Sequence, residues 1–281
     1  MNKIVIYADS TCDLSEKLIK ENHIKIMPLY VTFDQEIYKD KIDITTEQLY
    51  KKVDECKKLP KTSAASVGDF LTIFEKELND GNDIVFFTIG STLSSTYQNA
   101  LIARENSDPS RIEIIDSLNL SSAIGLQVLK ACKFKKIGMD IHQIKAEIEK
   151  ITPKVRAKFA IESLEYLHKG GRCSGASRLF GTLLQLKPVI AVKDGKMDVD
   201  AKTRGKKKAL DYMLTDIIEN KENVDIDYIM VTHTYADDEA KDLQIKLQNE
   251  FPNSNVEITD AGCVISSHCG KGTIGILYIE K

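Results

Sequence analysis

The chain of 281 residues has no excess of charge of either sign, because 39 Lys and Arg residues face 42 Asp and Glu residues and leave a formal net charge of −3. A basic surplus drives nucleic-acid binding through the release of counterions, so its absence argues against a nucleic-acid-binding protein. The six cysteines are scattered and include no Cys-x-x-Cys pair. In a chain of this size they do not indicate a disulfide framework.

Long apolar runs are absent as well, and no stretch approaches the roughly 18 apolar residues in a row that indicate a membrane-spanning helix. The apolar run that starts at Ile4 ends before Asp9, which is too short for a signal peptide. The sequence thus contains no integral membrane segment and predicts a cytoplasmic protein. Its composition, with 42% hydrophobic and 29% charged residues, is typical of a globular chain. Its length favours about two domains.

The first half of the chain alternates short runs rich in Ile and Val with segments of helical periodicity. Residues 4–8, 84–89 and 111–116 have the composition of buried strands, and helical segments separate them. This alternation favours a parallel sheet that is covered by helices on both faces. Residues 24–33 also have the composition of one strand.

Two short polar motifs predict helix starts. Asp13 followed by Glu16, and Ser66 followed by Asp69, both have the spacing of a capping box. In this motif a side-chain oxygen at the first position accepts a backbone N–H, and the later side chain returns the bond. Gly81 is placed to end the second of these helices.

The second half also alternates strands and helices, but it contains a hairpin signal. Asp194-Gly195 can supply the positive φ angles of a type I′ turn, so at least one strand pair is expected to be antiparallel. Helices are predicted at residues 179–186 and 206–219. The chain is therefore predicted to form two α/β domains: residues 1–157, with a mainly parallel sheet flanked by helices, and residues 158–281, with a mixed sheet and helices.

Five polar segments follow strands or lie between elements, which is where α/β proteins bind ligands. They offer many hydroxyls, one guanidinium and one imidazole but few carboxylates, which is a donor set suited to an oxyanion. They lack the paired acids of a glycosidase and the clustered ligands of a metal site, so we assign no catalytic residue and no metal. Each Ser or Thr is also a common helix cap, and this role stays open for any one of them. The segments are residues 9–13, 61–66, 90–97, 202–205 and 266–270.

Two motifs resemble enzyme signatures in the wrong context. Residues 270–275 fit the Gly-x-Gly-x-x-Gly pattern, yet only a strand is expected to follow them, so no helix N-terminus could receive a pyrophosphate. Residues 90–94 resemble the Gly-x-Ser-x-Gly nucleophile elbow but end in serine. Two enzyme alternatives stay open: a hydrolase that uses Ser94 with His268, and a phosphotransferase that uses the glycine-rich turn.

Six blocks of the sequence, taken in order, resemble the DegV family of bacterial fatty-acid-binding proteins. They include an Asp-Ser-x-x-Asp-Leu motif, a Thr-Ser turn, a helix start rich in hydroxyls and a Lys-Gly-Gly-Arg segment. No single block is specific, but the six together follow the family's order and span nearly the whole chain. The blocks lie at residues 9–14, 62–66, 91–98, 169–172, 202–210 and 267–276.

The resemblance implies a protein that holds one long-chain fatty acid in an apolar tunnel, with the carboxylate bound by Ser and Thr hydroxyls near the interdomain cleft. It implies no cofactor beyond this ligand. The residues assigned to the carboxylate are Thr62, Ser94, Ser95 and His268, and those assigned to the headgroup or to a partner are Arg204 and Ser63. The apolar candidates for the tunnel wall are Phe70, Phe86, Phe87, Leu93, Leu101, Ile124 and Leu126.

Some relatives in this family present the acid to a separate ATP-dependent kinase, which forms the acyl phosphate used in phospholipid synthesis. The resemblance therefore implies a fatty acid kinase as partner, and it leaves room for transient contact with a membrane. Neutral donors leave a carboxylate nucleophilic, whereas a bidentate arginine would reduce its nucleophilicity. We therefore expect Arg204 to face the phosphate donor or the kinase. The alternative is a lipid-sensing regulatory module that meets no kinase.

Overall fold

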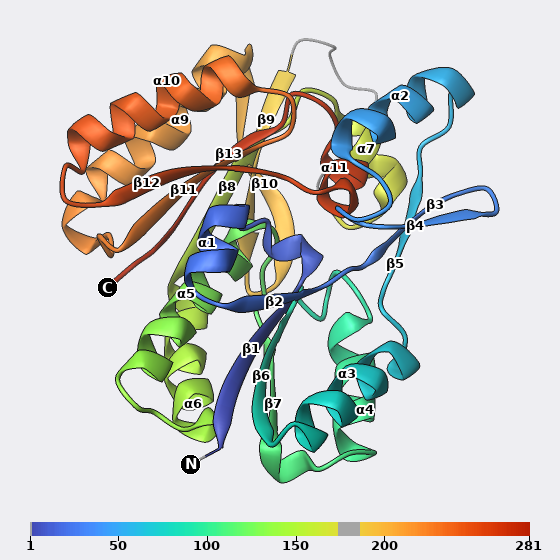
Figure 1. Cartoon of the computed structure of the whole chain (residues 1–281). Coiled ribbons are helices and arrows are strands. Elements are labelled where there is room, and N and C mark those ends of the chain that lie inside the picture. Colours follow the sequence, from blue (N-terminus) through green and yellow to red (C-terminus); the bar gives the residue numbers. More distant parts are fainter. Residues whose placement is uncertain (1, 174–185) are drawn as a thin grey trace.

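The computed structural model describes residues 2–173 and 186–281, which form two large β-sheets with their helices and a third, smaller sheet (Figure 1). The fold is α/β, as the sequence predicts, with one parallel and one mixed large sheet. The helix predicted at residues 179–186 lies outside the described residues, except for Leu186, which begins a strand. No helix in the described ranges is long and apolar enough to cross a membrane.

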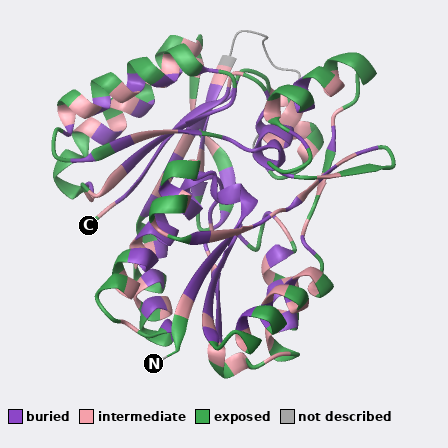
Figure 2. Ribbon diagram, viewed as in Figure 1, coloured by how far each residue is buried: buried purple, intermediate pink, exposed green. Residues whose placement is uncertain are grey.

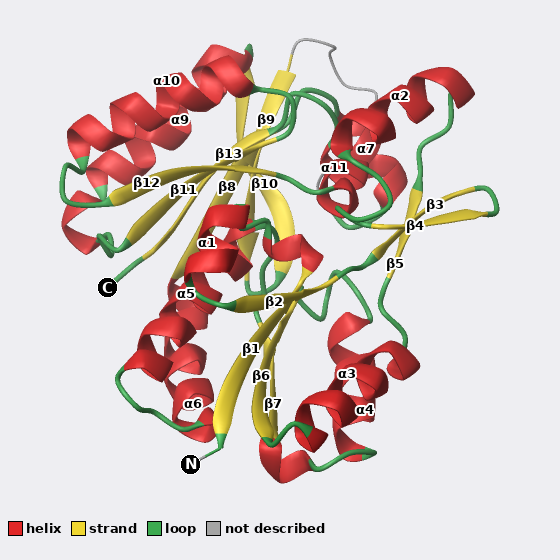
Figure 3. Ribbon diagram, in the orientation of Figure 1, coloured by secondary structure: helices red, strands yellow, loops and turns green. Residues whose placement is uncertain are grey.

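The first sheet has four parallel strands in the order β2-β1-β6-β7. Helices α3 and α4 cover one face, and α5 and α6 lie on the other (Figure 3). The strands are β1 (Lys3–Asp9), β2 (Ile24–Met27), β6 (Asn82–Thr88) and β7 (Ile112–Asp116). The helices are α1 (Glu16–Glu21), α3 (Val67–Asn79), α4 (Thr96–Glu105), α5 (Ser122–Lys136) and α6 (Ile141–Ile151).

The second sheet has six strands in the order β10-β9-β8-β13-β11-β12, of which only the β11–β12 pair is parallel. The predicted hairpin turn between β9 and β10 is confirmed, with φ angles of 51° at Asp194 and 75° at Gly195. The strands are β8 (Val155–Ala160), β9 (Leu186–Lys193), β10 (Lys196–Arg204), β11 (Tyr228–His233), β12 (Asn255–Asp260) and β13 (Ile274–Ile279). Helices α9 (Lys206–Glu219) and α10 (Asp237–Glu250) pack against this sheet.

Helix α5 connects the two large sheets. It contacts β1 and β6 of the parallel sheet and β8, β11 and β13 of the mixed sheet. Most of its residues are buried on every side (Figure 2), which is the pattern of a helix inside a protein rather than on its surface. The strand β8 spans the predicted boundary between residues 157 and 158 and belongs wholly to the mixed sheet.

A smaller unit beside the large sheets draws on both halves of the chain. Its three antiparallel strands have the order β4-β3-β5. Helix α11 packs against α2, α7, β3 and β5, so the C-terminal half contributes two helices to this unit. The elements are β3 (Tyr30–Phe33), β4 (Glu36–Lys39), β5 (Lys61–Ser63), α2 (Thr46–Cys56), α7 (Leu164–Gly170) and α11 (Cys263–Cys269).

Two local predictions are wrong. The single strand predicted at residues 24–33 is two strands, β2 and β3, in different sheets. Pro28 lies between them and cannot donate a ladder hydrogen bond. The capping box at Asp13 does not form, because Ser15 caps α1 and Asp13 adopts a left-handed conformation with a φ of 47°. The box at Ser66 and the helix at residues 206–219 are confirmed.

Candidate functional site

A cavity of about 300 Å³ lies where β5, α11 and the loop after β6 meet. Most of its lining residues are apolar, and we refer to the part lined by Thr62, Arg172 and His268 as its polar end. Five of the six residues that the sequence assigns to the site lie in this lining: Thr62, Ser63, Ser94, Ser95 and His268. The apolar lining residues are Leu29, Ala64, Ile89, Leu93, Leu120, Met197, Val264 and Ile265.

Three elements bring these side chains together. Thr62 lies in β5, which pairs with β3 and faces α11. The two serines follow β6 at the carboxyl end of the parallel sheet, where α/β folds place their ligands. His268 lies on α11, and Val264, Ile265 and Cys269 line the cavity from the same helix. The four positions have the spacing of one helical face, so α11 forms a wall of the cavity.

Thr62 and His268 form a direct hydrogen bond across the polar end, with 2.7 Å between Oγ1 and Nε2. The other ring nitrogen, Nδ1, is fully buried and forms no hydrogen bond with any described residue. A Cβ built on Gly170 would lie 2.4 Å from Nδ1, so a Cα hydrogen of Gly170 points toward this atom. A C–H group can point at the lone pair of a ring nitrogen, but it would clash with a hydrogen bound to that nitrogen.

These contacts fix the direction of the hydrogen bond. We assign the ring proton of neutral His268 to Nε2, because Nδ1 faces the Cα hydrogen of Gly170. Nε2 then donates to Thr62 Oγ1, and the hydroxyl hydrogen of Thr62 can donate to a ligand. Gly171 is the other glycine of the Lys-Gly-Gly-Arg segment. It ends α7 in a left-handed conformation, with a φ of 67°, that favours glycine.

The imidazole of His268 is neutral near pH 7. Burial, and to a smaller extent the charge of Arg172, lower the pKa of His268 from 6.5 to about 4. Removal from water disfavours the charged form of a histidine, and a neighbouring cation adds to this effect. His268 therefore acts as a hydrogen-bond donor and not as a counter-ion.

Ser94 and Ser95 also line the cavity. The hydroxyl of Ser94 lies 2.8 Å from Thr96 Oγ1 and accepts the backbone N–H of Thr96 at 3.3 Å. It therefore forms a local turn contact at the start of α4, although it is not the N-cap residue. Ser95 is the exposed N-cap residue of α4, and its side chain makes no capping bond.

The guanidinium at the polar end belongs to Arg172, whereas Arg204 lies outside the cavity lining. Arg172 follows α7, donates from Nη1 to Gly170 O at 2.5 Å, and lines the cavity. An isolated bridge between Cys173 and Met197 holds this segment beside β10. Arg204 is exposed at the end of β10. The sequence contained Arg172 in the Lys-Gly-Gly-Arg block but offered no local sign of its place near His268.

The polar end opens into a groove of about 790 Å³. Thr62, Arg172 and His268 line both the cavity and the groove, so they stand at the junction. The groove is basic, because its other charged lining residues are one acid, Asp34, and four lysines. Two of these lysines are ion-paired, Lys58 with Asp34 at 3.0 Å and Lys169 with Glu165 at 2.7 Å. The lysines are Lys57, Lys58, Lys61 and Lys169.

The described residues do not assemble either of the two enzyme sites considered from the sequence, the Ser94–His268 hydrolase or the phosphotransferase that uses the glycine-rich turn. Ser94 bonds Thr96 and His268 bonds Thr62, and no described carboxylate contacts His268, so no nucleophile–base–acid chain is assembled. The glycine-rich turn at residues 270–275 leads into β13 and not into a helix. Among the described residues, no group of three or more His, Cys, Asp or Glu could hold a metal ion.

The large aromatic residues near the site pack into the core and do not line the cavity. Phe70, Phe86 and Phe87 are fully buried, and the rings of Phe70 and Phe86 meet edge to face with centroids 5.0 Å apart. Of the seven apolar candidates for the tunnel wall, only Leu93 is in the lining. Ordinary core packing explains the others.

Fold and site together define an α/β protein of two large sheets and one small sheet, with a mostly apolar cavity whose polar end is lined by Thr62, neutral His268 and the guanidinium of Arg172. The sequence model of the DegV family matches residues 3–281, and the chain belongs to this family. A DegV domain-containing protein of Clostridium acetobutylicum is 37% identical over 281 residues, covering 100% of both chains.

Solved structures of similar proteins share the whole fold. A fatty-acid-binding DegV family protein from Thermus thermophilus superposes with a TM-score of 0.90 at 31% identity and covers 100% of both chains. DegV, a fatty acid binding protein from Bacillus subtilis, gives a TM-score of 0.90 at 27% identity, again over 100% of both chains. A stearic-acid-binding protein from Eubacterium ventriosum gives 0.88 at 27% identity, covering 99% of this chain and 98% of its own.

Proposed function

We propose that this protein binds a long-chain fatty acid with its tail in the cavity and its carboxylate at the polar end. The observation that carries this proposal is the Thr62–His268 hydrogen bond at the junction of the apolar cavity and the basic groove. The fatty acids bound by the similar solved proteins support it. No cofactor beyond this ligand is needed for binding.

The two ends of such a ligand make different demands. Each buried CH₂ group of the tail contributes about 0.8 kcal/mol, before the loss of tail freedom is subtracted. The carboxylate is costly to remove from water unless hydrogen bonds replace its hydration. The hydroxyls of Thr62 and Ser94 can supply them, at roughly 1.5–3 kcal/mol for each bond to a charged group.

His268 makes Thr62 a better donor in this arrangement. Because Nε2 donates to Thr62 Oγ1, the hydroxyl hydrogen is directed away from the ring and toward the ligand. Hydrogen bonds in such a chain polarise one another, so the second bond gains from the first. The pKa of His268, at about 4, keeps this donor chain neutral at ordinary pH.

The test is the retention of fatty acid by Thr62→Ala. We expect organic extraction and mass spectrometry of the purified wild-type protein to yield a long-chain fatty acid, and Thr62→Ala to bind it ten- to a hundredfold more weakly. Thr72→Ala is the matched control, because Thr72 is exposed on α3 and its hydroxyl donates to Gly68 O, away from the cavity lining. Equal affinities of the two variants would contradict the proposal.

We further propose that a separate ATP-dependent kinase phosphorylates the bound carboxylate, which would supply acyl phosphate for phospholipid synthesis. The donors that we assign to the carboxylate, Thr62 and Ser94, are neutral and leave it nucleophilic, whereas we assign Arg172 to the phosphate donor. The basic groove next to the junction suits the phosphates of a donor, since its lysines and Arg172 can neutralise them. We assign Arg204 to the contact with this partner, and its exposure at the end of β10 supports the assignment.

The two roles separate experimentally. We expect Arg204→Ala to retain fatty acid like the wild type and to form less acyl phosphate with the kinase. Thr62→Ala should instead lose retention. If Arg204→Ala loses retention as strongly as Thr62→Ala, this division of roles is refuted.

A further inference from the structure

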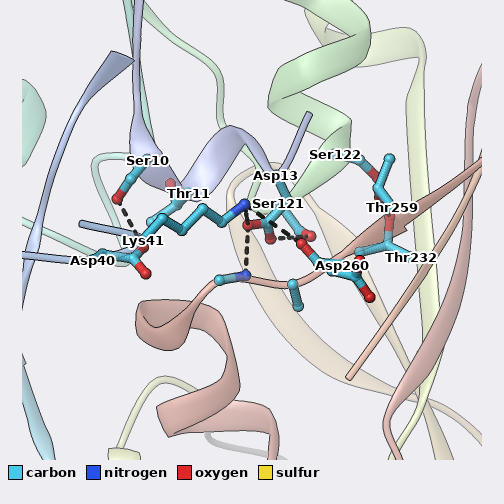
Figure 4. Close-up of polar contacts among 12 residues, drawn as sticks. Ser10, Thr11, Asp13, Asp40, Lys41, Ser121, Ser122, Thr232, Thr259 and Asp260 are labelled. Carbon is cyan, nitrogen blue, oxygen red and sulfur yellow. Dashed lines mark hydrogen bonds and ion pairs between the residues drawn. The ribbon is translucent and has the colours of Figure 1, made fainter. Parts of the chain in front are cut away.

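The carboxylate of Asp13 accepts a hydrogen bond from the start of α11, a helix far away in the sequence, and does not cap the adjacent helix α1. Asp13 is buried, and its Oδ1 accepts the backbone N–H of Gly262 at 2.7 Å across 249 residues of chain. Its Oδ2 accepts the hydroxyl of Ser121 at 2.7 Å. Lys41 Nζ lies 3.0 Å from Oδ1 and balances the charge (Figure 4).

Asp40 makes the matching contact at the next residue. Its buried carboxylate accepts the backbone N–H of Cys263 at 2.7 Å through Oδ1. Its Oδ2 accepts the hydroxyl of Ser10 at 2.8 Å (Figure 4). Ser10 in turn accepts the N–H of Leu29 at 3.1 Å, and Leu29 lines the cavity. We refer to Asp13, Asp40 and Lys41 as the carboxylate clamp.

The clamp accepts hydrogen bonds from two backbone N–H groups at the N-terminus of α11, those of Gly262 and Cys263. The N-cap of this helix is Gly262, which has no side chain to cap it, and the helix has only 7 residues. Unpaired N–H groups at a buried helix start are costly, and a helix this short gains little stability on its own. The two carboxylates accept N–H groups at this helix start, and their negative charge also stabilises the positive end of the helix dipole.

The approach of α11 to the clamp is close enough to require glycine at position 262. A Cβ built there would lie 2.6 Å from Lys41 Cε and 2.9 Å from Asp40 Oδ2. The helix start is therefore docked directly against the clamp.

We propose that Asp13, Asp40 and Lys41 are positioning residues that set the place of α11 and hence of His268 relative to Thr62. The inference rests on the proposed function, because it assigns the Asp-Ser-x-x-Asp-Leu segment to the ligand site through α11. Loss of the clamp should displace the whole wall that α11 contributes to the cavity.

The test compares Asp13→Ala with Asp13→Asn. Asparagine keeps an oxygen that can accept the N–H of Gly262, whereas alanine keeps none. We expect Asp13→Ala to release a bound fatty acid such as palmitate at least tenfold faster than the wild type, and Asp13→Asn to recover most of this loss. Equal release rates for wild type and Asp13→Ala would overturn the proposal.

Glu77→Gln is the matched control for the loss of a buried carboxylate. Glu77 is fully buried, accepts hydrogen bonds from Tyr7 and Asn82 at 2.7 Å each, and pairs with Lys25. It lies in α3, away from the cavity lining. This variant should lose thermal stability but release palmitate within about twofold of the wild-type rate. A similar acceleration in Glu77→Gln and Asp13→Ala would mean a general loss of stability and would refute positioning.

A second readout does not depend on the ligand. The imidazole NMR signals of His268 in the ligand-free protein should shift in Asp13→Ala and in Asp40→Asn and stay unchanged in Glu77→Gln. If the wild type binds no fatty acid while these shifts appear, the proposed function fails and the positioning role stands. Unshifted signals in both clamp variants would refute the positioning role. Asp40→Asn keeps the test decisive if Asp13→Ala does not fold.

Discussion

Gly170→Ala is the sharpest perturbation that the structure offers at the candidate site. The new Cβ would lie 2.4 Å from His268 Nδ1, whereas ordinary contact requires about 3.5 Å. The ring must therefore move by about 1 Å. Its Nε2 atom is 2.7 Å from Thr62 Oγ1, and a shift of this size breaks the bond or forces a clash.

The expected loss is about 1–2 kcal/mol of binding free energy, the usual contribution of one such hydrogen bond, or five- to thirtyfold in affinity. Helix propensity acts in the opposite direction, because alanine at the end of α7 favours the helix by up to about 1 kcal/mol. Gly170→Ala should thus bind fatty acid more weakly without losing thermal stability through the helix itself.

Isothermal titration with palmitate measures this effect, with Gly68→Ala as control. Gly68 lies in α3, and its added Cβ would meet Ser66 Oγ at 3.7 Å, which is ordinary contact. In a His268→Ala background the clash is absent, so Gly170→Ala should add no further loss there. An unchanged affinity of Gly170→Ala in the otherwise wild-type protein would refute the reasoning.

Two further predictions concern pH and the cavity. The pKa of His268 is lowered to about 4 in the folded protein. Between pH 6.5 and 4 the folded protein therefore binds fewer protons than the unfolded one. The free energy of unfolding should fall by up to about 3 kcal/mol as the pH drops through this range. Burial raises the pKa of Asp9 to about 6, so Asp9 makes the protein more stable as the pH drops and opposes the effect of His268. The contribution of His268 is therefore the difference in the free energy of unfolding between wild type and His268→Gln, measured by chemical denaturation at each pH. A difference that does not change with pH would contradict the burial of the ring. Ala64→Leu adds bulk to the cavity lining and should shift the preference toward shorter fatty acids, measured by competition between laurate and stearate; an unchanged preference would exclude this wall from tail binding.

The sequence predicts those parts of the fold that depend on local patterns. The capping box at Ser66, the Asp194-Gly195 turn and the helix at residues 206–219 each follow from neighbouring residues, and all three are present. The capping box at Asp13 has an equally good local pattern, yet its carboxylate binds the N-terminus of α11. A competing partner 249 residues away cannot be seen in a local pattern.

The candidate site shows the same division between local and long-range information. The resemblance to the DegV family points to Thr62, Ser94 and His268, which do line one cavity. It assigns Arg204 to the headgroup or a partner and gives Arg172 no role, whereas Arg172 lines the cavity and Arg204 does not. That distinction depends on how the end of α7 lies against β10, through the bridge between Cys173 and Met197. It is a consequence of tertiary packing.

The most direct test of the account is the ¹³C NMR signal of carboxyl-labelled palmitate bound to the protein. If the carboxylate is held by the donor chain that begins at His268, the signal should shift in Thr62→Ala and in His268→Ala and stay in place in Thr72→Ala. The same carboxyl signal in all four proteins, wild type included, would show that the acid end lies elsewhere and would contradict the central claim.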